Sequence, residues 1–324
     1  MKQVTLSVAA LAMLLGTVSA QAAGPYAHTY ASQKNGGPFP TFDCSYTDPC
    51  SSLQAAINNT TSPGIVTVTD GEFVEAITIS SQVSIEAYEG VSIILRPPAS
   101  GTAITINGGA SDKINITHLL ISGLGGGSTG IQFNSGQGLY MRDVTVSGFS
   151  GSPGVGINFS PNTAAASGVS QLSIKDSFIH QNTNGNILIS PTNSVVTDVK
   201  LTGVDLRNSL YGVRADSSAG SGLVRVTATD TEAINDNNNG FLAVGTGANP
   251  VHFMIDHSTA QNNAAYGAVA TGSNAFMILN NSIIVDNATG VAQLNGSTVA
   301  MPGNNVVNYN STNITGTITT LSLH

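Results

Sequence analysis

The 324-residue sequence is poor in the residue types that carry charge and large aromatic surface. It contains no tryptophan, ten lysines plus arginines, and only 9% charged residues in total. Disordered chains are charge-rich and apolar-poor, whereas 41% of this chain is hydrophobic, so disorder is excluded. The basic residues are scattered singly and the net charge is −8. A nucleic-acid partner needs a basic stripe, so the sequence argues against one; acidic polymers are also disfavoured, unless a local patch or a bridging cation overrides the average.

Long hydrophobic runs are missing after the N-terminus. The first residues, MKQVTLSVAALAMLLGTVSAQAAG, combine Lys2, an apolar stretch from Val4 to Leu15, and small residues suited to cleavage. This pattern predicts a secretory signal peptide over residues 1–22, since the apolar stretch is too short to span a bilayer. We therefore expect an exported protein, secreted or periplasmic, without a membrane span after signal removal.

Cysteine is equally scarce, with only Cys44 and Cys50, which lie in the segment DCSYTDPC. Because export places the chain in an oxidising compartment, we expect a local disulfide between them. A metal pair is the alternative, but no histidine or further cysteine stands nearby in the sequence.

A short helix is predicted directly after the second cysteine. The segment SSLQAAIN offers Ser51 or Ser52 as an N-cap and places Leu53, Ala56 and Ile57 on one helical face. We expect this helix to cap the N-terminal end of the fold within residues 23–63, where a stack of strands would otherwise expose its apolar side chains and open edges.

Asparagine and glycine are abundant, and they recur with a regular period. The asparagines that open each motif follow one another at steps of 26, 27, 27 and 25 residues, and glycines keep the same period: Asn182, Asn208, Asn235, Asn262 and Asn287, with Gly185, Gly212, Gly240, Gly267 and Gly290. Such a period is typical of a solenoid, in which each repeat forms one structural unit.

Short alternating apolar runs fill the space between these motifs, such as INI at 114–116, VRV at 224–226 and MIL at 277–279. Each predicts a three-residue strand whose outer residues point inward. Three strands in about 26 residues, with no helix between them, predict an all-β, right-handed, single-stranded parallel β-helix solenoid. We expect about nine coils in one body over residues 64–308, followed by a C-terminal cap or tail at 309–324.

The asparagine-rich segment DNNNG at 236–240 has two interpretations. Asn, Asp and Gly tolerate left-handed backbone angles, so these residues suit the corners of coils, and the five periodic asparagines would then stack as an amide ladder. The alternative is a loop that binds a sugar or Ca²⁺, but Asp236 lacks a second dedicated carboxylate nearby. No motif predicts a metal or another cofactor.

Longer segments carry a resemblance to a known family. The segments HTYASQKNG, PCSSLQAAINNTTSPGIVTVTDGEF and AITISSQVSIEAYEGV, and the C-terminal PGNNVVNYN, resemble secreted bacterial right-handed parallel β-helix proteins of the pectin-lyase-like superfamily. The resemblance implies the fold, in a superfamily of polysaccharide-cleaving enzymes, phage tailspikes and adhesins. The polygalacturonase signatures Asn-Thr-Asp, Asp-Asp, Gly-His-Gly and Arg-Ile-Lys are absent, so no catalytic residue is carried over.

Alignment of the coils on their turn residues predicts which side chains point outward together. Two positions after the turn, the column contains Thr145, Phe178, Asp205, Glu232, Ser258 and Ile283; four positions after it, the column contains Ser147, His180, Arg207, Ile234, Ala260 and Val285. Asp205, Glu232, His180 and Arg207 are therefore expected to form the densest outward cluster of ionisable groups.

This cluster has a chemical and a structural interpretation. Two neighbouring carboxylates suit a retaining glycosidase, and His180 with Arg207 suits a lyase-like elimination. In the structural interpretation, charges of alternating sign on neighbouring coils limit repulsion. Tyr211 and Tyr266 precede corner glycines and are candidates for stacking on sugar rings. His118 and His257 are expected at solvated corners.

Two functions remain open from the sequence. The first is a non-catalytic scaffold that contacts polysaccharide or a cell-surface glycan, favoured by the missing enzyme signatures and sparse charge. The second is a polysaccharide lyase or glycoside hydrolase acting on an outward face through Asp205, Glu232, Arg207 and His180. The oligomeric state is not predicted.

Overall fold

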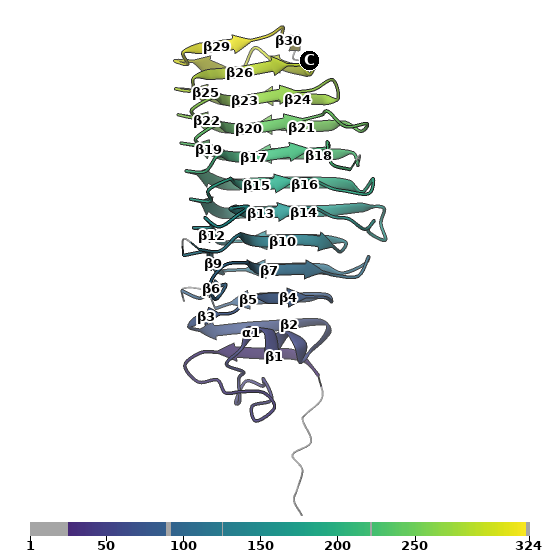
Figure 1. The fold of residues 1–324 in the computed structure, drawn as a ribbon, viewed down its shortest axis with the longest axis vertical. Coiled ribbons are helices and arrows are strands. Elements are labelled where there is room, and N and C mark those ends of the chain that lie inside the picture. The colour runs from purple at the N-terminus through teal and green to yellow at the C-terminus, as the bar shows by residue number, and fades with distance from the viewer. Residues whose placement is uncertain (1–24, 89–91, 125, 221, 322–324) are drawn as a thin grey trace, which may run out of the picture.

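The computed structural model describes residues 25–88, 92–124, 126–220 and 222–321. Short parallel strands wind around a rod, and each strand pairs with its counterpart in the next coil (Figure 1). The architecture is the predicted right-handed parallel β-helix, with about nine turns. The predicted signal peptide, residues 1–22, lies outside the described residues. No helix among the described residues is long and apolar enough to cross a membrane.

The first face of the rod is its longest column of strands. It contains β1 (Tyr26–Ser32), β2 (Thr60–Asp70), β5 (Val83–Ala87), β8 (Lys113–Thr117), β11 (Gly138–Arg142), β14 (Val169–His180), β16 (Val196–Arg207), β18 (Val224–Thr229), β21 (Val251–Asp256), β24 (Ala275–Asn280), β27 (Thr298–Pro302) and β30 (Thr319–Leu321).

The second face joins the first at a corner, and β14 and β16 run across that corner to contribute to both faces. Its other strands are β3 (Glu72–Val74), β6 (Ile94–Arg96), β9 (Leu120–Ser122), β12 (Thr145–Ser147), β19 (Glu232–Ile234), β22 (Thr259–Gln261), β25 (Ile283–Val285) and β28 (Val306–Asn308). The two faces together form one 20-stranded sheet.

The third face is a separate ten-stranded sheet. It contains β4 (Ile77–Ile79), β7 (Thr102–Asn107), β10 (Thr129–Ser135), β13 (Val155–Phe159), β15 (Gly185–Ile189), β17 (Tyr211–Asp216), β20 (Asn239–Val244), β23 (Tyr266–Thr271), β26 (Thr289–Leu294) and β29 (Thr312–Thr315). The stacking thus continues past Asn308, since β29 pairs with β26 and β30 pairs with β27, within the segment expected to form a separate cap or tail.

Inward-pointing side chains fill the rod with stacked apolar residues. In β8, the predicted INI run buries Ile114 and Ile116, and these pair with Leu139 and Met141 one coil later. Phe133 stacks on the ring of Phe159 with centroids 4.4 Å apart. Parallel in-register stacking of like side chains keeps this interior continuous from coil to coil, because each apolar residue meets an equivalent one above and below.

The corners between faces use the left-handed backbone that the sequence predicted. Only three of the five asparagines that were expected to stack are corner residues. Asn208, Asn235 and Asn262 have φ values of 55°, 59° and 54° and sit at the corner between the second and third faces. The side chains of Asn182 and Asn287 instead point inward. The predicted five-asparagine ladder is therefore only partly correct: Asn262 Nδ2 donates to Asn235 Oδ1 at 2.7 Å between neighbouring coils, but Asn182 and Asn287 belong to an inward column.

The inward column is itself a ladder, of mixed composition: Asn182, Ser209, Asp236, Asn263, Asn287 and Asn310. In each step a backbone N–H of one coil donates to a side-chain oxygen of the next, as from Asp236 to Asn263 Oδ1 at 3.0 Å. The segment DNNNG is thus a structural device: Asp236 is buried in the ladder and offers no carboxylate to an external sugar or Ca²⁺.

The corner glycines have a steric role. A Cβ on Gly212 would lie 2.8 Å from the carbonyl oxygen of Gly240, and a Cβ on Gly240 would lie 2.7 Å from that of Gly267. Since Cβ atoms do not approach carbonyl oxygens so closely, the third-face strands can stack here only with glycine at these positions.

The N-terminal end is closed by the expected helix, α1 (Leu53–Asn58). Ser52 is its N-cap, and Leu53, Ala56 and Ile57 are buried. The Gln54 side chain donates to the Thr78 carbonyl at 3.1 Å and accepts from the Thr78 N–H at 2.6 Å. Gln54 therefore satisfies the backbone groups that the first strand of the third face would otherwise leave unpaired.

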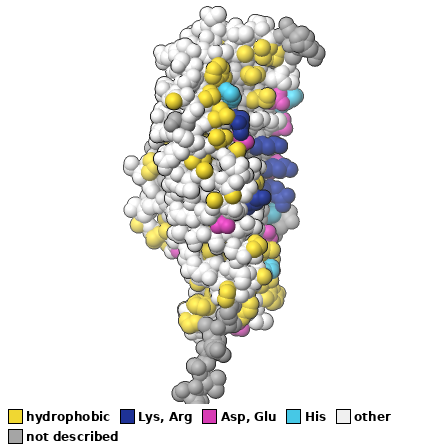
Figure 2. Space-filling view, turned by 90° about the vertical axis from the view of Figure 1, so that its right-hand side faces the viewer, with side chains coloured by type: hydrophobic (Ala, Val, Ile, Leu, Met, Phe, Trp, Pro, Cys, Tyr) yellow, Lys and Arg dark blue, Asp and Glu magenta, His cyan; other side chains and the backbone are white. Residues whose placement is uncertain are grey.

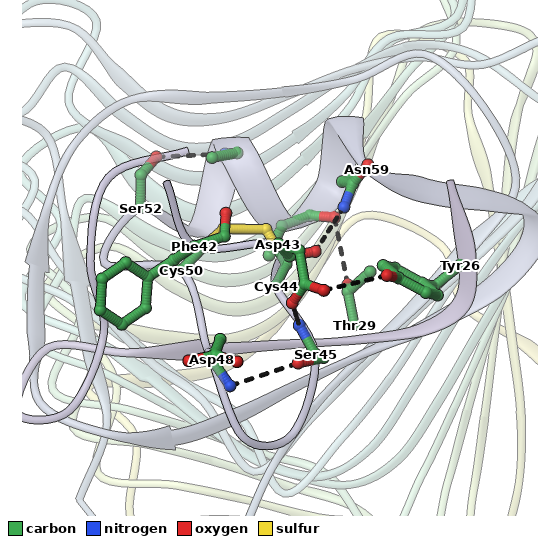
Figure 3. The surroundings of a disulfide bond; sticks show 12 residues. Tyr26, Thr29, Phe42, Asp43, Cys44, Ser45, Asp48, Cys50, Ser52 and Asn59 are labelled. Atoms are coloured by element: carbon green, nitrogen blue, oxygen red, sulfur yellow. Dashed lines mark hydrogen bonds between the residues drawn. A yellow bond between two sulfur atoms is a disulfide. The ribbon is translucent and has the colours of Figure 1, made fainter. Parts of the chain in front are cut away.

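A disulfide between Cys44 and Cys50 stabilises the loop before this helix, as predicted. Figure 3 shows the loop tied to the coil by Tyr26 Oη, which donates to Asp43 Oδ2 at 3.0 Å, and by Asn59 Nδ2, which donates to the Asp43 carbonyl at 2.6 Å. Both cysteines are fully buried. The bond therefore belongs to the N-terminal cap and leaves no thiol for metal binding.

Candidate functional site

The predicted cluster of ionisable residues is assembled on the second face. Asp205 of β16 lies directly opposite Glu232 of β19, and His180 of β14 lies opposite Arg207. The structure therefore brings together all four candidate residues, on three successive coils. Their side chains point outward, and those of Asp205, Arg207 and Glu232 are 34%, 38% and 48% exposed.

The charges of this cluster are already paired with one another. Arg207 Nε donates to Asp205 Oδ1 at 2.5 Å, and Arg207 Nη2 donates to Glu232 Oε2 at 3.2 Å. One guanidinium thus holds both carboxylates. A retaining glycosidase needs one carboxylate free to attack and one carboxylic acid free to donate a proton, whereas here one arginine is bound to both carboxyl groups.

The His180 side chain packs against its neighbours and is partly buried. Its ring stacks on Phe178 with centroids 4.0 Å apart, and Phe178 also lies 6.0 Å from the Arg207 guanidinium carbon. Burial is the main cause that lowers the pKa of His180 below its usual range, so the ring is neutral at pH 7. Phe178, 37% exposed, was not recognised as part of the cluster and gives it an aromatic surface.

The outward columns differ from their predicted composition in one coil. The left-handed corner residue there is His257, with φ of 46°, rather than Asp256. The outward residues of β22 are consequently Thr259 and Gln261, and the predicted Ser258 and Ala260 are buried. The predicted alignment is correct for Asp205 and Glu232, because the one-residue shift occurs in the next coil, at His257. His118 lies at a corner, as expected, with φ of 58°.

The two tyrosines do not form a sugar-stacking pair. Tyr211, Asn239 and Tyr266 are register partners on three coils of the third face. Tyr211 is only 3% exposed, and its ring fills the space over Gly185, where a Cβ would lie 2.2 Å from it. Burial raises the pKa of Tyr211 to about 12. Tyr211 is thus a packing residue, and the prediction that it contacts a ligand is wrong; Tyr266 remains half-buried.

The first face carries a feature that sequence reasoning missed. Five of the ten basic residues of the chain point outward from five successive strands of this face: Lys113, Arg142, Lys175, Lys200 and Arg225. We call this set the basic column. Figure 2 shows Lys and Arg side chains following one another along the rod. The expectation that the chain has no basic stripe is therefore wrong.

Coil stacking creates the basic column from residues that lie far apart in the sequence. Strand spacing places successive coils about 4.8 Å apart, so the five cations recur along the rod axis, although they occupy three different positions across the strands. A signal existed in the sequence: each of these residues lies within or next to an apolar run. Alignment of those runs, rather than of the turns alone, would have found the column.

Acidic neighbours only partly neutralise the basic column. Asp143 lies 3.5 Å from Arg142, Asp176 lies 3.5 Å from Lys175, and Asp198 Oδ1 accepts from Arg225 Nε at 2.5 Å. Within the described part of the chain, Lys113 and Lys200 form no ion pair. The first face thus keeps cations available to an external anion, in contrast to the self-paired cluster on the second face.

A groove of about 580 Å³ runs beside the upper part of the basic column. Its polar lining comprises Tyr140, Gln171, Ser173, Asp198, Lys200, Arg225 and Thr227. Tyr140 Oη donates to Gln171 Oε1 at 2.6 Å, and burial raises the pKa of Tyr140 above its usual value, so the phenol stays a neutral hydrogen-bonding group. Hydroxyl, amide and cationic groups together suit a polar, anionic ligand.

No cluster of three or more His, Cys, Asp or Glu side chains in the described ranges has the geometry of a metal site. On the first face, Asp143, Asp176 and Asp198 each lie against a neighbouring cation. On the second face, Arg207 bridges Asp205 and Glu232.

Comparisons with known proteins identify the architecture. No protein-family model and no curated protein matches the sequence. Among solved structures, the A-module of the Azotobacter vinelandii mannuronan C-5 epimerase AlgE4 matches with a TM-score of 0.54 and 13% identity, over 90% of this chain and 94% of the module. A pectate lyase matches with a TM-score of 0.45 and 12% identity, over 91% and 76% of the two chains. A lacto-N-biosidase from Eubacterium ramulus matches with a TM-score of 0.46 and 8% identity, over 90% and 67%. At 13% identity, the similarity to the epimerase module shows a shared fold and no more.

Proposed function

We propose that this protein is an exported, carbohydrate-interacting β-helix whose first face binds an anionic polysaccharide without cleaving it. The basic column is the observation that carries the proposal. An extended polyanion lying along the rod axis meets a cation on each of five coils, and Lys200 has no competing carboxylate partner among the described residues.

The groove beside the basic column supports a saccharide as the ligand. Sugar hydroxyls both donate and accept hydrogen bonds, and Gln171, Ser173 and Thr227 offer both kinds of group in one lining. The named substrate of the epimerase module, mannuronan, is a carbohydrate, which is in keeping with the proposal. The net charge of −8 disfavours tight binding of polyanions elsewhere on the surface.

The proposal is tested by calorimetric titration of the purified protein with polygalacturonate and with neutral dextran. We expect polygalacturonate to bind, and its affinity to fall about tenfold between roughly 50 and 200 mM salt, because bound cations release counterions from the polymer. Replacement of Lys175 and Lys200 by Gln should weaken binding and flatten the salt dependence. Equal affinity for dextran, or binding that ignores salt, would contradict the proposal.

A second candidate function is glycan cleavage at the second-face cluster. It is favoured by the direct opposition of Asp205 and Glu232 beside the exposed ring of Phe178. The bonds from Arg207 to both carboxylates favour the structural role instead. Assays for unsaturated products and reducing ends on acidic and neutral polysaccharides decide between the two. Cleavage that is lost in the Asp205→Ala, Glu232→Ala variant would establish this site as catalytic.

A further inference from the structure

The first face changes character above the basic column. On β21 and β24 its outward side chains are His252, Met254, Phe276 and Ile278, followed at the strand ends by Asp256 and Asn280, which are hydrogen-bonded to each other. Met254, Phe276 and Ile278 are 42%, 38% and 39% exposed, which is unusual for large apolar residues that also touch one another across coils. Isolated exposed apolar residues are ordinary in proteins, whereas a contiguous patch of them marks a binding surface.

Strand register makes this patch continuous with the basic column. Arg225, His252 and Phe276 are successive partners in one outward column, while Thr227, Met254 and Ile278 form the next. Figure 2 shows hydrophobic side chains and a histidine beside the upper end of the line of Lys and Arg side chains. A ligand that follows the rod axis therefore passes directly from cationic to apolar surroundings.

The four residues line an apolar groove of about 380 Å³, whose walls also include Arg225 and Thr227. Arg225 and Thr227 also line the groove of about 580 Å³ beside the basic column, so the two grooves meet at Arg225. The ring of His252 stands edge-on to that of Phe276, with centroids 5.4 Å apart, and forms a fixed wall. Met254 supplies a flexible side chain that adapts to an apolar guest.

We propose that the ligand of the first face is an anionic glycan that carries a hydrophobic acyl group, with the acyl chain lying in the apolar groove. This inference rests on the proposed function, because the saccharide anions occupy the basic column. Arg225 lies at the junction, where a sugar carboxylate and the attached ester would be close together. A sugar ring can stack its C–H face on one aromatic ring such as Phe276, but it does not also cover Met254 and Ile278. An acyl substituent covers apolar surface and binds more tightly for each methylene removed from water.

The test compares three probes by calorimetry: a hexameric oligogalacturonate, the same oligomer bearing octanoyl esters, and free octanoate. We expect the octanoylated oligomer to bind the unmodified protein at least tenfold more tightly than the plain oligomer, since burial of about two methylenes corresponds to that factor. Free octanoate should bind weakly, because it lacks the series of anions that the basic column requires.

Two variants localise the effect. Met254→Gln with Ile278→Gln should abolish the gain from octanoylation and leave affinity for the plain oligomer unchanged. Ile283→Gln is the matched control, since Ile283 is 45% exposed and lies in the same coil as Ile278 but on the second face. The control should retain the full gain, and all variants should show the circular dichroism spectrum and melting profile of a folded β-helix.

Each outcome separates the two proposals. If the plain oligomer fails to bind, the proposed function is wrong. If it binds but octanoylation gives no gain, or the gain persists in the Met254→Gln, Ile278→Gln variant, the proposed function stands and the acyl inference is wrong. Free octanoate that binds as tightly as the octanoylated oligomer would also overturn the inference, because the glycan would then contribute nothing.

Discussion

The first and second faces of this rod arrange their charged side chains in different ways. On the second face, Arg207 lies between Asp205 and Glu232 and satisfies both within the protein. On the first face, cations recur on five successive coils, and Lys200 has no acidic partner in the part of the chain that the structure describes. In a stacked fold, charges that pair fully with one another stabilise the stack itself, whereas an excess of cations over acidic partners remains available to a ligand.

A buried carboxyl group in the inward ladder, that of Asp236, gives the largest expected effect. Asp236 accepts from the Ser209 N–H through Oδ1, while its Oδ2 has no partner among the described residues. Its neighbour Asn263 fills the equivalent position with an amide that donates to the Ala233 carbonyl at 3.1 Å. Burial raises the pKa of Asp236 to about 8, so a proton on the carboxyl takes the place of the amide hydrogen.

We expect the free energy of unfolding to fall as pH rises from about 4 to about 8, because the folded state holds a proton on Asp236 that the unfolded state releases. The Asp236→Asn variant should remove that slope and gain on the order of 5 kcal/mol at pH 8. Denaturant-induced unfolding curves at pH 5, 6.5 and 8 measure the pH dependence of the free energy of unfolding and the gain in the variant. Asp205→Asn is the exposed control, and a slope that survives in Asp236→Asn would contradict the assignment.

The next largest effect is expected from charge reversal in the basic column. Lys200→Glu should weaken polygalacturonate binding by more than tenfold, about 1.4 kcal/mol or more, because it replaces an unpaired cation with a repelling anion. Lys34→Glu changes the net charge equally but lies in the N-terminal cap, so its affinity should stay near that of the unmodified protein. Equal losses in the two variants would mean that only net charge matters, and that the column has no specific role.

The smallest effects come from a matched pair of arginines. Arg207→Met and Arg225→Met each remove one arginine that is 38% or 44% exposed and bound to acidic partners, so each should cost at most about 1 kcal/mol of stability. Only Arg225→Met should weaken polysaccharide binding. Thermal melts and the calorimetric titration distinguish stability from binding, and an affinity loss in Arg207→Met would place the ligand on the second face instead.

Much of the second-face cluster was predictable from the number of residues per coil and the distance of each residue from its corner. Asp205 and Glu232 lie 27 residues apart, one coil, and both follow a corner residue by two positions. The asparagine ladder was predicted only in part, with Asn235 and Asn262 in contact, because neighbouring positions of a corner have similar composition. Asn182 and Asn208 look equivalent in sequence, yet one points inward and the other turns the chain. A shift of one residue exchanges inside for outside.

The sequence by itself determined the fold, since the repeat period and the short apolar runs are those of a stack of parallel coils. It also determined the N-terminal helix and the disulfide, because both depend on residues that are close together in the sequence. Only the tertiary structure decided which charged side chains lie together on the first face. Lys113 and Arg225 are 112 residues apart, and coils of unequal length separate the five cations by unequal intervals. Only the register of stacked strands brings them onto one face, because hydrogen bonding between coils, rather than distance along the chain, determines which side chains become neighbours.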